Sequence, residues 1–145
     1  MRVLLWKVCS EALPTLASLR RRRSDIDSEC TGCGVETETI RHVLIECHFA
    51  RQFWALSQMP WQCLSDWQSS AADWVFQVLQ RLDGTDAVCF CGGIWKIWQD
   101  RCCRVMEGKT QSPAAAWHEL TAILDGYQAA RRSTRFRHTV GSTAG

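Results

Sequence analysis

The sequence predicts a mainly α-helical protein, with a small helical module containing paired cysteines at its N-terminus and a three-helix, bundle-like segment after it. Over most of the chain, apolar residues recur every three or four positions, which is the spacing of one face of a helix. Proline, glycine and serine residues stand at the ends of these runs, where helices begin and stop. Alternation of apolar and polar residues over strand length is nearly absent, so at most a small hairpin is expected, around Gly32 and Gly34.

Two short helices are expected near the N-terminus. The first covers residues 3–12 and is turned by Pro14, because a proline ring cannot continue a helix. Thr15 is a good N-cap for the second, since its hydroxyl can accept a hydrogen bond from a free N–H group of the first turn. This second helix leads into four consecutive arginines: Arg20, Arg21, Arg22 and Arg23.

Three longer helices are expected in the C-terminal half. The first covers residues 66–82, stops at Gly84 and carries one inward apolar stripe: Trp67, Ala71, Trp74, Val78 and Leu82. The second covers residues 85–108 and carries another stripe: Val88, Cys91, Trp95, Trp98, Cys102 and Val105. The third begins at Ser112, has Pro113 in its first helical position, and carries a third stripe: Trp117, Leu120, Leu124 and Tyr127.

Composition limits the class of protein. A chain of 145 residues with 46% hydrophobic and 22% charged content fits one globular domain and excludes disorder for most of its length. No apolar run is long enough to span a membrane and no secretory signal is recognised, so we expect no membrane partner and an intracellular location, nuclear or cytoplasmic. The nine cysteines are odd in number and lack the spacing of a disulfide framework, which favours metal binding or burial.

Patterning divides the chain into three parts. Residues 1–60 form the cysteine-containing module, residues 61–132 the helical segment, and residues 133–145 a tail rich in small and basic residues that is expected to be disordered. The net charge of +2 does not identify a partner, because a nucleic-acid-binding protein is recognised by where its basic residues cluster.

The most informative motif is C-x2-C-x8-H-x4-C, formed by Cys30, Cys33, His42 and Cys47. Two thiolates separated by two residues can close a tight turn on one metal ion, and the neighbouring glycines permit that turn. Three sulfurs and one imidazole nitrogen complete a tetrahedral site with no open position, so the motif predicts one structural Zn²⁺ in a zinc-knuckle module. Because residues five apart lie about 140° apart around an α-helix, the helix expected over residues 37–46 must end before the last cysteine.

Alternatives to this ligand set remain. His48 is a rival fourth ligand, because H-x5-H spacing also occurs in zinc fingers, although Cys47 is favoured. A redox-active cysteine pair is disfavoured, since no parallel-strand pattern surrounds the motif. The other six cysteines lie in or beside apolar stripes and are expected to pack as small hydrophobic residues: Cys9, Cys63, Cys89, Cys91, Cys102 and Cys103.

The N-terminal residues resemble the reverse-transcriptase zinc-binding domain of non-LTR, LINE-type retrotransposon polyproteins, a family abundant in plants. The resemblance covers residues 1–54 and rests on the zinc motif, the segment 38–47, and these further positions: Trp6, Lys7, Leu13, Pro14, Thr15, Leu19, Arg20, Phe49, Ala50, Arg51 and Trp54. Residues 94–101 and 107–109 resemble the helical segment that joins this domain to a ribonuclease H domain. The sequence departs from the family pattern at Thr31, His48 and Cys102, and none of these removes a ligand.

The resemblance implies a non-enzymatic zinc-binding module with an accessory role near RNA or DNA in reverse transcription. No polymerase signature, ribonuclease H acidic cluster, nucleophile triad or phosphate loop is recognised, so no catalytic residues are expected. Phosphate contacts are expected from arginines near the metal motif: Arg20, Arg21, Arg22, Arg23, Arg41 and Arg51. The alternative is a zinc-stabilised interaction or scaffold module, whose helices dock onto a polymerase or ribonuclease H domain or self-associate.

Overall fold

The computed structural model describes the backbone of residues 2–143 and the side chains of residues 2–134. Its elements, in chain order, are α1 (Arg2–Cys9), α2 (Leu16–Arg22), η1 (His42–Glu46), α3 (His48–Ser57), α4 (Trp61–Ser65), α5 (Ala71–Arg81), α6 (Gly84–Glu107) and α7 (Pro113–Thr143). Within these residues no strand forms, and the antiparallel bridge between Glu29 and Thr37 stands alone. The predicted mainly α fold class is confirmed.

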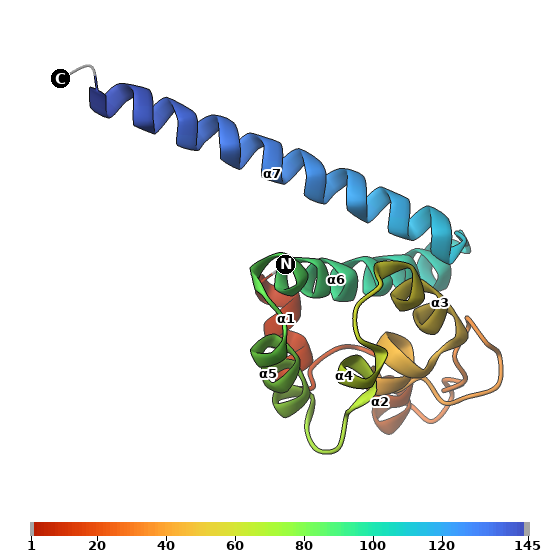
Figure 1. Ribbon diagram of the computed structural model, residues 1–145. Helices are drawn as coiled ribbons and strands as arrows, with labels where there is room; N and C mark the ends of the chain where they lie inside the picture. Colours follow the sequence, from red (N-terminus) through yellow and green to blue (C-terminus); the bar gives the residue numbers. More distant parts are fainter. Residues whose placement is uncertain (1, 144–145) are drawn as a thin grey trace.

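The N-terminal and C-terminal helices share one hydrophobic core. Figure 1 shows α1 to α6 gathered into one body, with α7 starting on that body and then leaving it. The helix α1 packs against α5 and α6, while η1 and α3 pack against α6, and α7 lies on α3 and α6. The helices of the predicted second region therefore pack directly on the module that carries the cysteine motif.

The two N-terminal helices form where the sequence places them. The hydroxyl of Thr15 accepts a hydrogen bond of 3.3 Å from the Ser18 N–H and caps α2, as expected. The first helix ends earlier than predicted, at Cys9 rather than residue 12, and Glu11 adopts a positive φ of 55° in the turn that follows. Leu13 and Thr15 are buried, which fixes this turn against the core.

The helix predicted over residues 66–82 begins later, at Ala71. Ser70 caps it, because its hydroxyl accepts the Asp73 N–H at 3.2 Å and its own backbone is extended. The residues before it turn back on themselves, with the Trp67 indole donating to the Ser69 carbonyl at 3.1 Å. The predicted inward stripe is confirmed for Trp67, Ala71, Trp74 and Val78, which are buried.

The buried face of α6 differs from the predicted stripe. Its centre is formed by Phe90, Gly93, Ile94, Ile97 and Arg101. Of the predicted stripe, Trp98 is buried and Val88 is exposed, and the other members are half-buried along the flank. The reason is a close approach that counting apolar residues does not detect. A Cβ atom on Gly93 would lie 2.5 Å from the Trp54 ring, so only glycine lets α3 pack this closely.

The last helix extends into the segment predicted to be a tail, and only its first part is packed. Ala116 and Leu120 are fully buried, and the Trp117 ring meets Phe53 edge-on at 5.5 Å. Tyr127, predicted to be inward, is exposed because α7 has left the body before reaching it. The predicted disordered tail, 133–145, overlaps the end of α7, and most of it lies outside the residues with described side chains, so its disorder stays a prediction. Over the described residues, no helix is both long and apolar enough to cross a membrane.

Candidate metal centre

A tight turn presents the first two cysteines. The Gly34 N–H donates to the Cys30 carbonyl at 2.7 Å, and Gly34 adopts a positive φ of 70°, which glycine tolerates without strain. Two further backbone bonds close the arms of the turn: the Cys30 N–H donates to the Glu36 carbonyl at 2.7 Å, and the Glu38 N–H donates to the Ser28 carbonyl at 2.8 Å. Together with the isolated bridge, these bonds form the small hairpin-like turn expected around the glycines.

A π turn brings the histidine and the last cysteine together. In η1, the Cys47 N–H donates to the His42 carbonyl at 2.7 Å, five residues earlier. Such a turn closes over one residue more than an α turn, so residues five apart return to the same side of the helix. Cys47 itself is extended and precedes α3, which confirms that the helix ends before it. The Thr39 hydroxyl accepts the His42 N–H at 3.0 Å and fixes where the turn begins.

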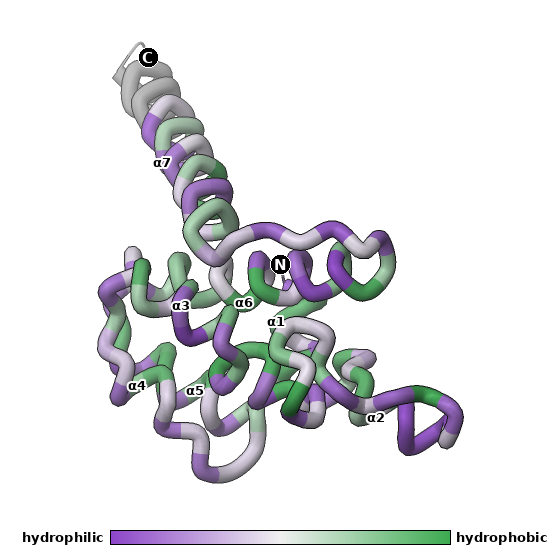
Figure 2. The backbone as a smooth tube through the Cα atoms, turned by 90° about the vertical axis from the view of Figure 1, so that its right-hand side faces the viewer, coloured by the Kyte–Doolittle hydropathy of each residue, from purple (hydrophilic) through white to green (hydrophobic). Residues whose placement is uncertain are grey.

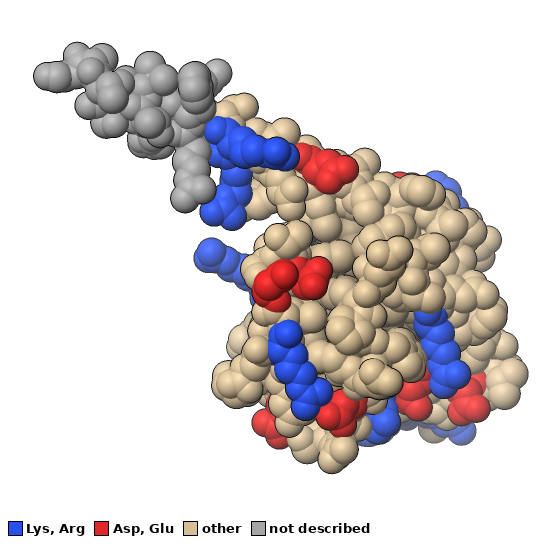
Figure 3. Space-filling model, in the orientation of Figure 1, with Lys and Arg blue, Asp and Glu red and all other residues tan. Residues whose placement is uncertain are grey.

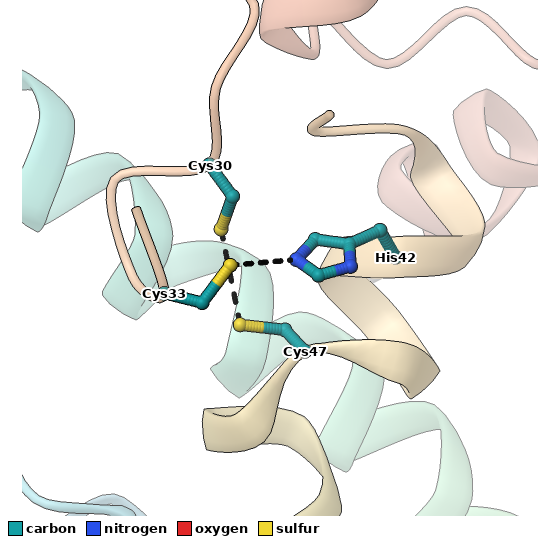
Figure 4. A group of neighbouring side chains, drawn as sticks. All are labelled: Cys30, Cys33, His42 and Cys47. Carbon is teal, nitrogen blue, oxygen red and sulfur yellow. Dashed lines mark hydrogen bonds between the residues drawn. The ribbon is translucent and has the colours of Figure 1, made fainter. Parts of the chain in front are cut away.

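The four side chains point toward one another, as Figure 4 shows. The Sγ atoms of Cys30 and Cys47 are 3.8 Å apart, the Cys33 Sγ lies 3.5 Å from the His42 Nε2, and all four ligand atoms lie within 4.8 Å of one another. Tetrahedral zinc, with Zn–S bonds of about 2.3 Å and Zn–N bonds of about 2.0 Å, places two sulfurs about 3.8 Å apart and a sulfur and a nitrogen about 3.5 Å apart. The spacing of the donor atoms therefore fits this ion.

Hydrogen bonding within the cluster favours the thiolate form of Cys30. Cys30, His42 and Cys47 are buried, and Cys33 is half-buried. A hydrogen bond from the Cys47 thiol, helped by the N–H groups of Cys33 and Gly32, lowers the pKa of the Cys30 thiol to about 4 against the opposing effect of burial. The hydrogen bond with Cys30, together with burial, raises the pKa of the Cys47 thiol, so the pair holds one thiolate, the form of cysteine that binds metals, beside one protonated thiol.

The rival ligand His48 lies outside the cluster. It is the first residue of α3, is exposed, and its Nε2 lies 3.0 Å from the Gln52 amide nitrogen. Cys47, one residue earlier, points inward with 2% of its surface exposed. The structure therefore brings together the four residues that the motif predicts and does not bring His48 to them.

Arg104 of α6 reaches over the cysteine turn. Its Nε donates to the Thr31 hydroxyl at 3.0 Å. A Cβ atom on Gly32 would lie 3.2 Å from the Arg104 Nη2 and 3.4 Å from the Cys47 Sγ, so the guanidinium and the sulfur flank the same glycine. Arg104 thus places a positive charge beside the cysteines, a role that the sequence did not reveal.

A buried ion pair ties the motif to the C-terminal half. The Arg101 Nη2 lies 2.7 Å from the Glu38 Oε1, and the side chains are 6% and 0% exposed. The same carboxylate oxygen accepts the Leu16 N–H at 2.8 Å, at the start of α2. Arg101 also donates to the Pro14 carbonyl at 3.2 Å and lies over the Trp98 ring at 4.5 Å. In the sequence Glu38 stands near Glu36 and Arg101 stands beside Asp100, so nothing singles out either residue or identifies its partner.

The predicted phosphate-binding arginines differ in their surroundings. Arg20, Arg21 and Arg22 are exposed at the end of α2, whereas Arg23 pairs with Asp25 at 3.0 Å and Arg41 with Glu46 at 3.6 Å. A hollow of about 220 Å³ is lined by both Arg21 and Arg41. A second hollow, of about 490 Å³, is lined by Arg51 together with His42, His48 and two glutamates.

The remaining cysteines are buried or half-buried and lie outside the cluster. Cys63 belongs to the core, and Cys9, Cys89, Cys91 and Cys102 pack against it, which confirms the packing predicted for these five. Cys103 is half-buried. Burial raises the pKa of the Cys89 thiol to about 11 and also raises that of Cys9 and Cys91, so these thiols stay protonated at neutral pH.

Residues 1–54 match the family model described as zinc-binding in reverse transcriptase. The resemblance derived from the sequence is confirmed for this segment. The further resemblance of residues 94–109 lies beyond the matched segment and stays a prediction. No curated protein and no solved structure matches the chain.

Proposed function

We propose that this chain is a non-enzymatic zinc-binding module that holds one structural Zn²⁺ through Cys30, Cys33, His42 and Cys47 and makes accessory contacts to nucleic acid in reverse transcription. The observation that carries the proposal is the closed set of four donor atoms, all within 4.8 Å of one another, in the segment that matches the zinc-binding family. When bound, the ion acts as a cross-link between the cysteine turn and η1.

The donor set favours a structural over a catalytic role. Four protein ligands complete a tetrahedral site, whereas a catalytic zinc keeps one position for water or substrate. Three thiolates and one neutral imidazole leave the ion with a net charge of −1, which the adjacent guanidinium of Arg104 offsets. Free thiolates last in reducing compartments, so we place the module inside the cell, in the nucleus or the cytoplasm.

The nucleic-acid contact is proposed for the exposed end of α2. Arg20, Arg21 and Arg22 carry no acidic partner among the described residues, and Arg21 shares its hollow with Arg41. Guanidinium groups bind phosphates with forked hydrogen bonds, and such contacts are tolerant of sequence and sensitive to salt. Arg23, the residue after α2, is already engaged by Asp25, and Arg51 lines the separate hollow that contains His42 and His48.

Elemental analysis of the purified full chain tests the zinc assignment. We expect one zinc per chain, and loss of that zinc together with part of the helical circular dichroism in Cys33→Ser. Cys103→Ser is the matched control, because this half-buried cysteine lies outside the cluster, and it should keep the metal. A folded chain without zinc, or equal zinc loss in the control, would contradict the assignment.

Fluorescence anisotropy with a labelled single-stranded RNA tests the nucleic-acid contact. We expect Arg20→Gln with Arg21→Gln to weaken binding and to reduce its dependence on salt, since log K falls by about 0.7 per phosphate contact for each unit of log[salt] with single strands. Arg81→Gln is the matched control, because Arg81 is an exposed arginine on α5 that pairs with Asp66. Unchanged binding in the double variant would refute a contact at this surface.

A protein-docking role is the alternative, and one surface favours it. A mostly apolar hollow of about 450 Å³ lies between α1 and α6, lined by Val3, Leu4, Trp95 and Trp98 among others, and Trp6 nearby is 65% exposed. A polymerase or ribonuclease H domain, or a second copy of the chain, would cover such a surface. Sedimentation of the zinc-loaded chain separates the two proposals, because concentration-dependent association without RNA binding supports docking.

A further inference from the structure

The helix α7 has two parts with different surroundings. Its first part is packed through Leu124, whose side chain approaches Gly92 of α6. From Asp125 to Thr134, every described residue is exposed. Figures 1 and 2 show from two directions that this second part leaves the body of the molecule. The exposed part therefore contributes little to the core, and its sequence is free to serve another purpose.

This exposed part is basic and contains almost no acid. After Asp125 the sequence has no Asp or Glu, but it has four arginines: Arg131, Arg132, Arg135 and Arg137. Figure 3 shows basic side chains gathered on α7 where it leaves the body. Arg131 and Arg132 are exposed, and the described hydrogen bond of Arg132 is made within its own helix, to the Gln128 carbonyl at 3.5 Å. Their charges are therefore available to a partner.

The helical register places three of the four arginine positions on one side of the helix. Positions 131, 132 and 135 fall within about 100° of arc on an α-helix. Like charges four residues apart repel each other and destabilise a free helix, and Gly126 at the base of this part weakens it further. A polyanion that neutralises the arginines removes the repulsion, so binding and helix formation support each other.

We propose that residues 125–143 of α7 form a basic arm that binds the phosphate backbone of nucleic acid, separately from the arginines of α2. A membrane surface is a poorer partner, because the sequence of residues 125–143 has only three large apolar or aromatic residues, Tyr127, Phe136 and Val140, and interfacial helices need a broad apolar face. An acidic protein offers charge without the regular phosphates that forked guanidinium groups recognise. This proposal rests on the proposed function only in taking nucleic acid as the polyanion, and it does not depend on Arg20, Arg21 or Arg22.

The test compares the full zinc-loaded chain with Arg131→Gln/Arg132→Gln, using a labelled 20-nucleotide single-stranded RNA at several salt concentrations. Removal of two phosphate contacts should lower the slope of log K against log[salt] by about 1.4 and weaken binding in a sequence-independent way. Helical circular dichroism of the unsubstituted chain should rise when RNA is added. Unchanged affinity and slope in this variant would overturn the proposal.

Arg20→Gln/Arg21→Gln, measured beside it, separates the two surfaces. Weaker binding in the arm variant alone supports the arm and refutes the contact at α2. Weaker binding in the α2 variant alone does the reverse. Absence of RNA binding by the unsubstituted chain overturns both. Release of RNA by an equal charge concentration of polyglutamate overturns nucleic acid as the specific partner of the arm.

Discussion

Glu38 is the most deeply buried charged residue of the described chain. With 0% of its surface exposed, it holds Arg101 of α6 and the N–H of Leu16 at the start of α2, so one carboxylate joins three segments. Burial of an ion pair adds little net stability, but removing one partner strands the other charge away from water. The pair therefore favours the one packing of these three segments in which both charges are satisfied.

We predict that Glu38→Gln lowers the free energy of unfolding by roughly 3–5 kcal/mol, because it leaves the Arg101 guanidinium buried without a counter-charge. Urea unfolding of the zinc-loaded chain measures this. Glu107→Gln serves as the control, since its partner Lys109 is largely exposed and the change should be near zero. Equal effects of both substitutions would contradict the role given to the buried pair.

Lys96 sets an alkaline limit on stability. Burial acts to lower its pKa, but the hydrogen bond to Glu119 and the charge of Asp100 together raise that pKa above 10.5. The folded state holds this proton more tightly than the unfolded state does. The stabilisation of the fold by protonated Lys96 is therefore complete below pH 10.5 and is lost as pH rises through the folded pKa. We expect unfolding free energy measured from pH 9 upward to fall more steeply in the unsubstituted chain than in Lys96→Met. Parallel curves would contradict this.

At the residue scale, the sequence predicts those groups whose residue types and local spacing are enough to indicate their role. The C-x2-C-x8-H-x4-C spacing and the cap at Thr15 are of this kind, and the structure gathers the four residues and forms the cap. Glu38 and Arg101 are 63 positions apart, and nothing in a single sequence states that they meet. Partners of this kind depend on how the helices pack.

At the element scale, the helices were predictable and their buried faces were less so. Periodicity located α5, α6 and the packed part of α7, but the central face of α6 depends on Gly93 and Arg101, which no apolar count includes. The π turn of η1 was also beyond prediction, because the change from an α turn is a single shifted hydrogen bond. That shift is what aligns His42 with Cys47.

Two glycines in helices should respond in opposite ways to substitution by alanine. Gly93→Ala is expected to cost about 1–3 kcal/mol, because its Cβ would lie 2.5 Å from the buried Trp54 ring. Gly126→Ala should stabilise the helix locally by about 1 kcal/mol, since nothing lies within 4 Å of its Cβ position. Thermal unfolding and helical circular dichroism measure both. Equal tolerance of the two substitutions would contradict the close contact of α3 with α6.

At the scale of the whole molecule, the metal cluster and the helical body are one structure. The cysteine turn contacts α6 through Arg104, and the following segment contacts it through Glu38, so the turn is held from two sides. The family match ends at residue 54, yet the partners of its buried charges lie on α6, near residue 100. Residues 1–54 are therefore not expected to keep their full stability when isolated.

Removal of zinc should lower the stability of parts of the chain outside the cluster. We expect chelation to loosen the cysteine turn and η1, and then to weaken the contacts of the turn with α6, lowering the unfolding temperature of the whole chain. Hydrogen exchange before and after chelation should show faster exchange first in residues 28–47 and next in the C-terminal half of α6. Faster exchange confined to the exposed part of α7 would contradict this coupling.

We propose that three sulfurs and one nitrogen hold one zinc ion in this chain. X-ray absorption at the zinc edge of the purified protein tests it most directly. We expect three sulfur neighbours at about 2.3 Å and one nitrogen neighbour at about 2.0 Å, from Cys30, Cys33, Cys47 and His42. Two sulfurs with two nitrogens would place His48 in the site instead of Cys47, and oxygen neighbours or no bound zinc would contradict a closed structural centre.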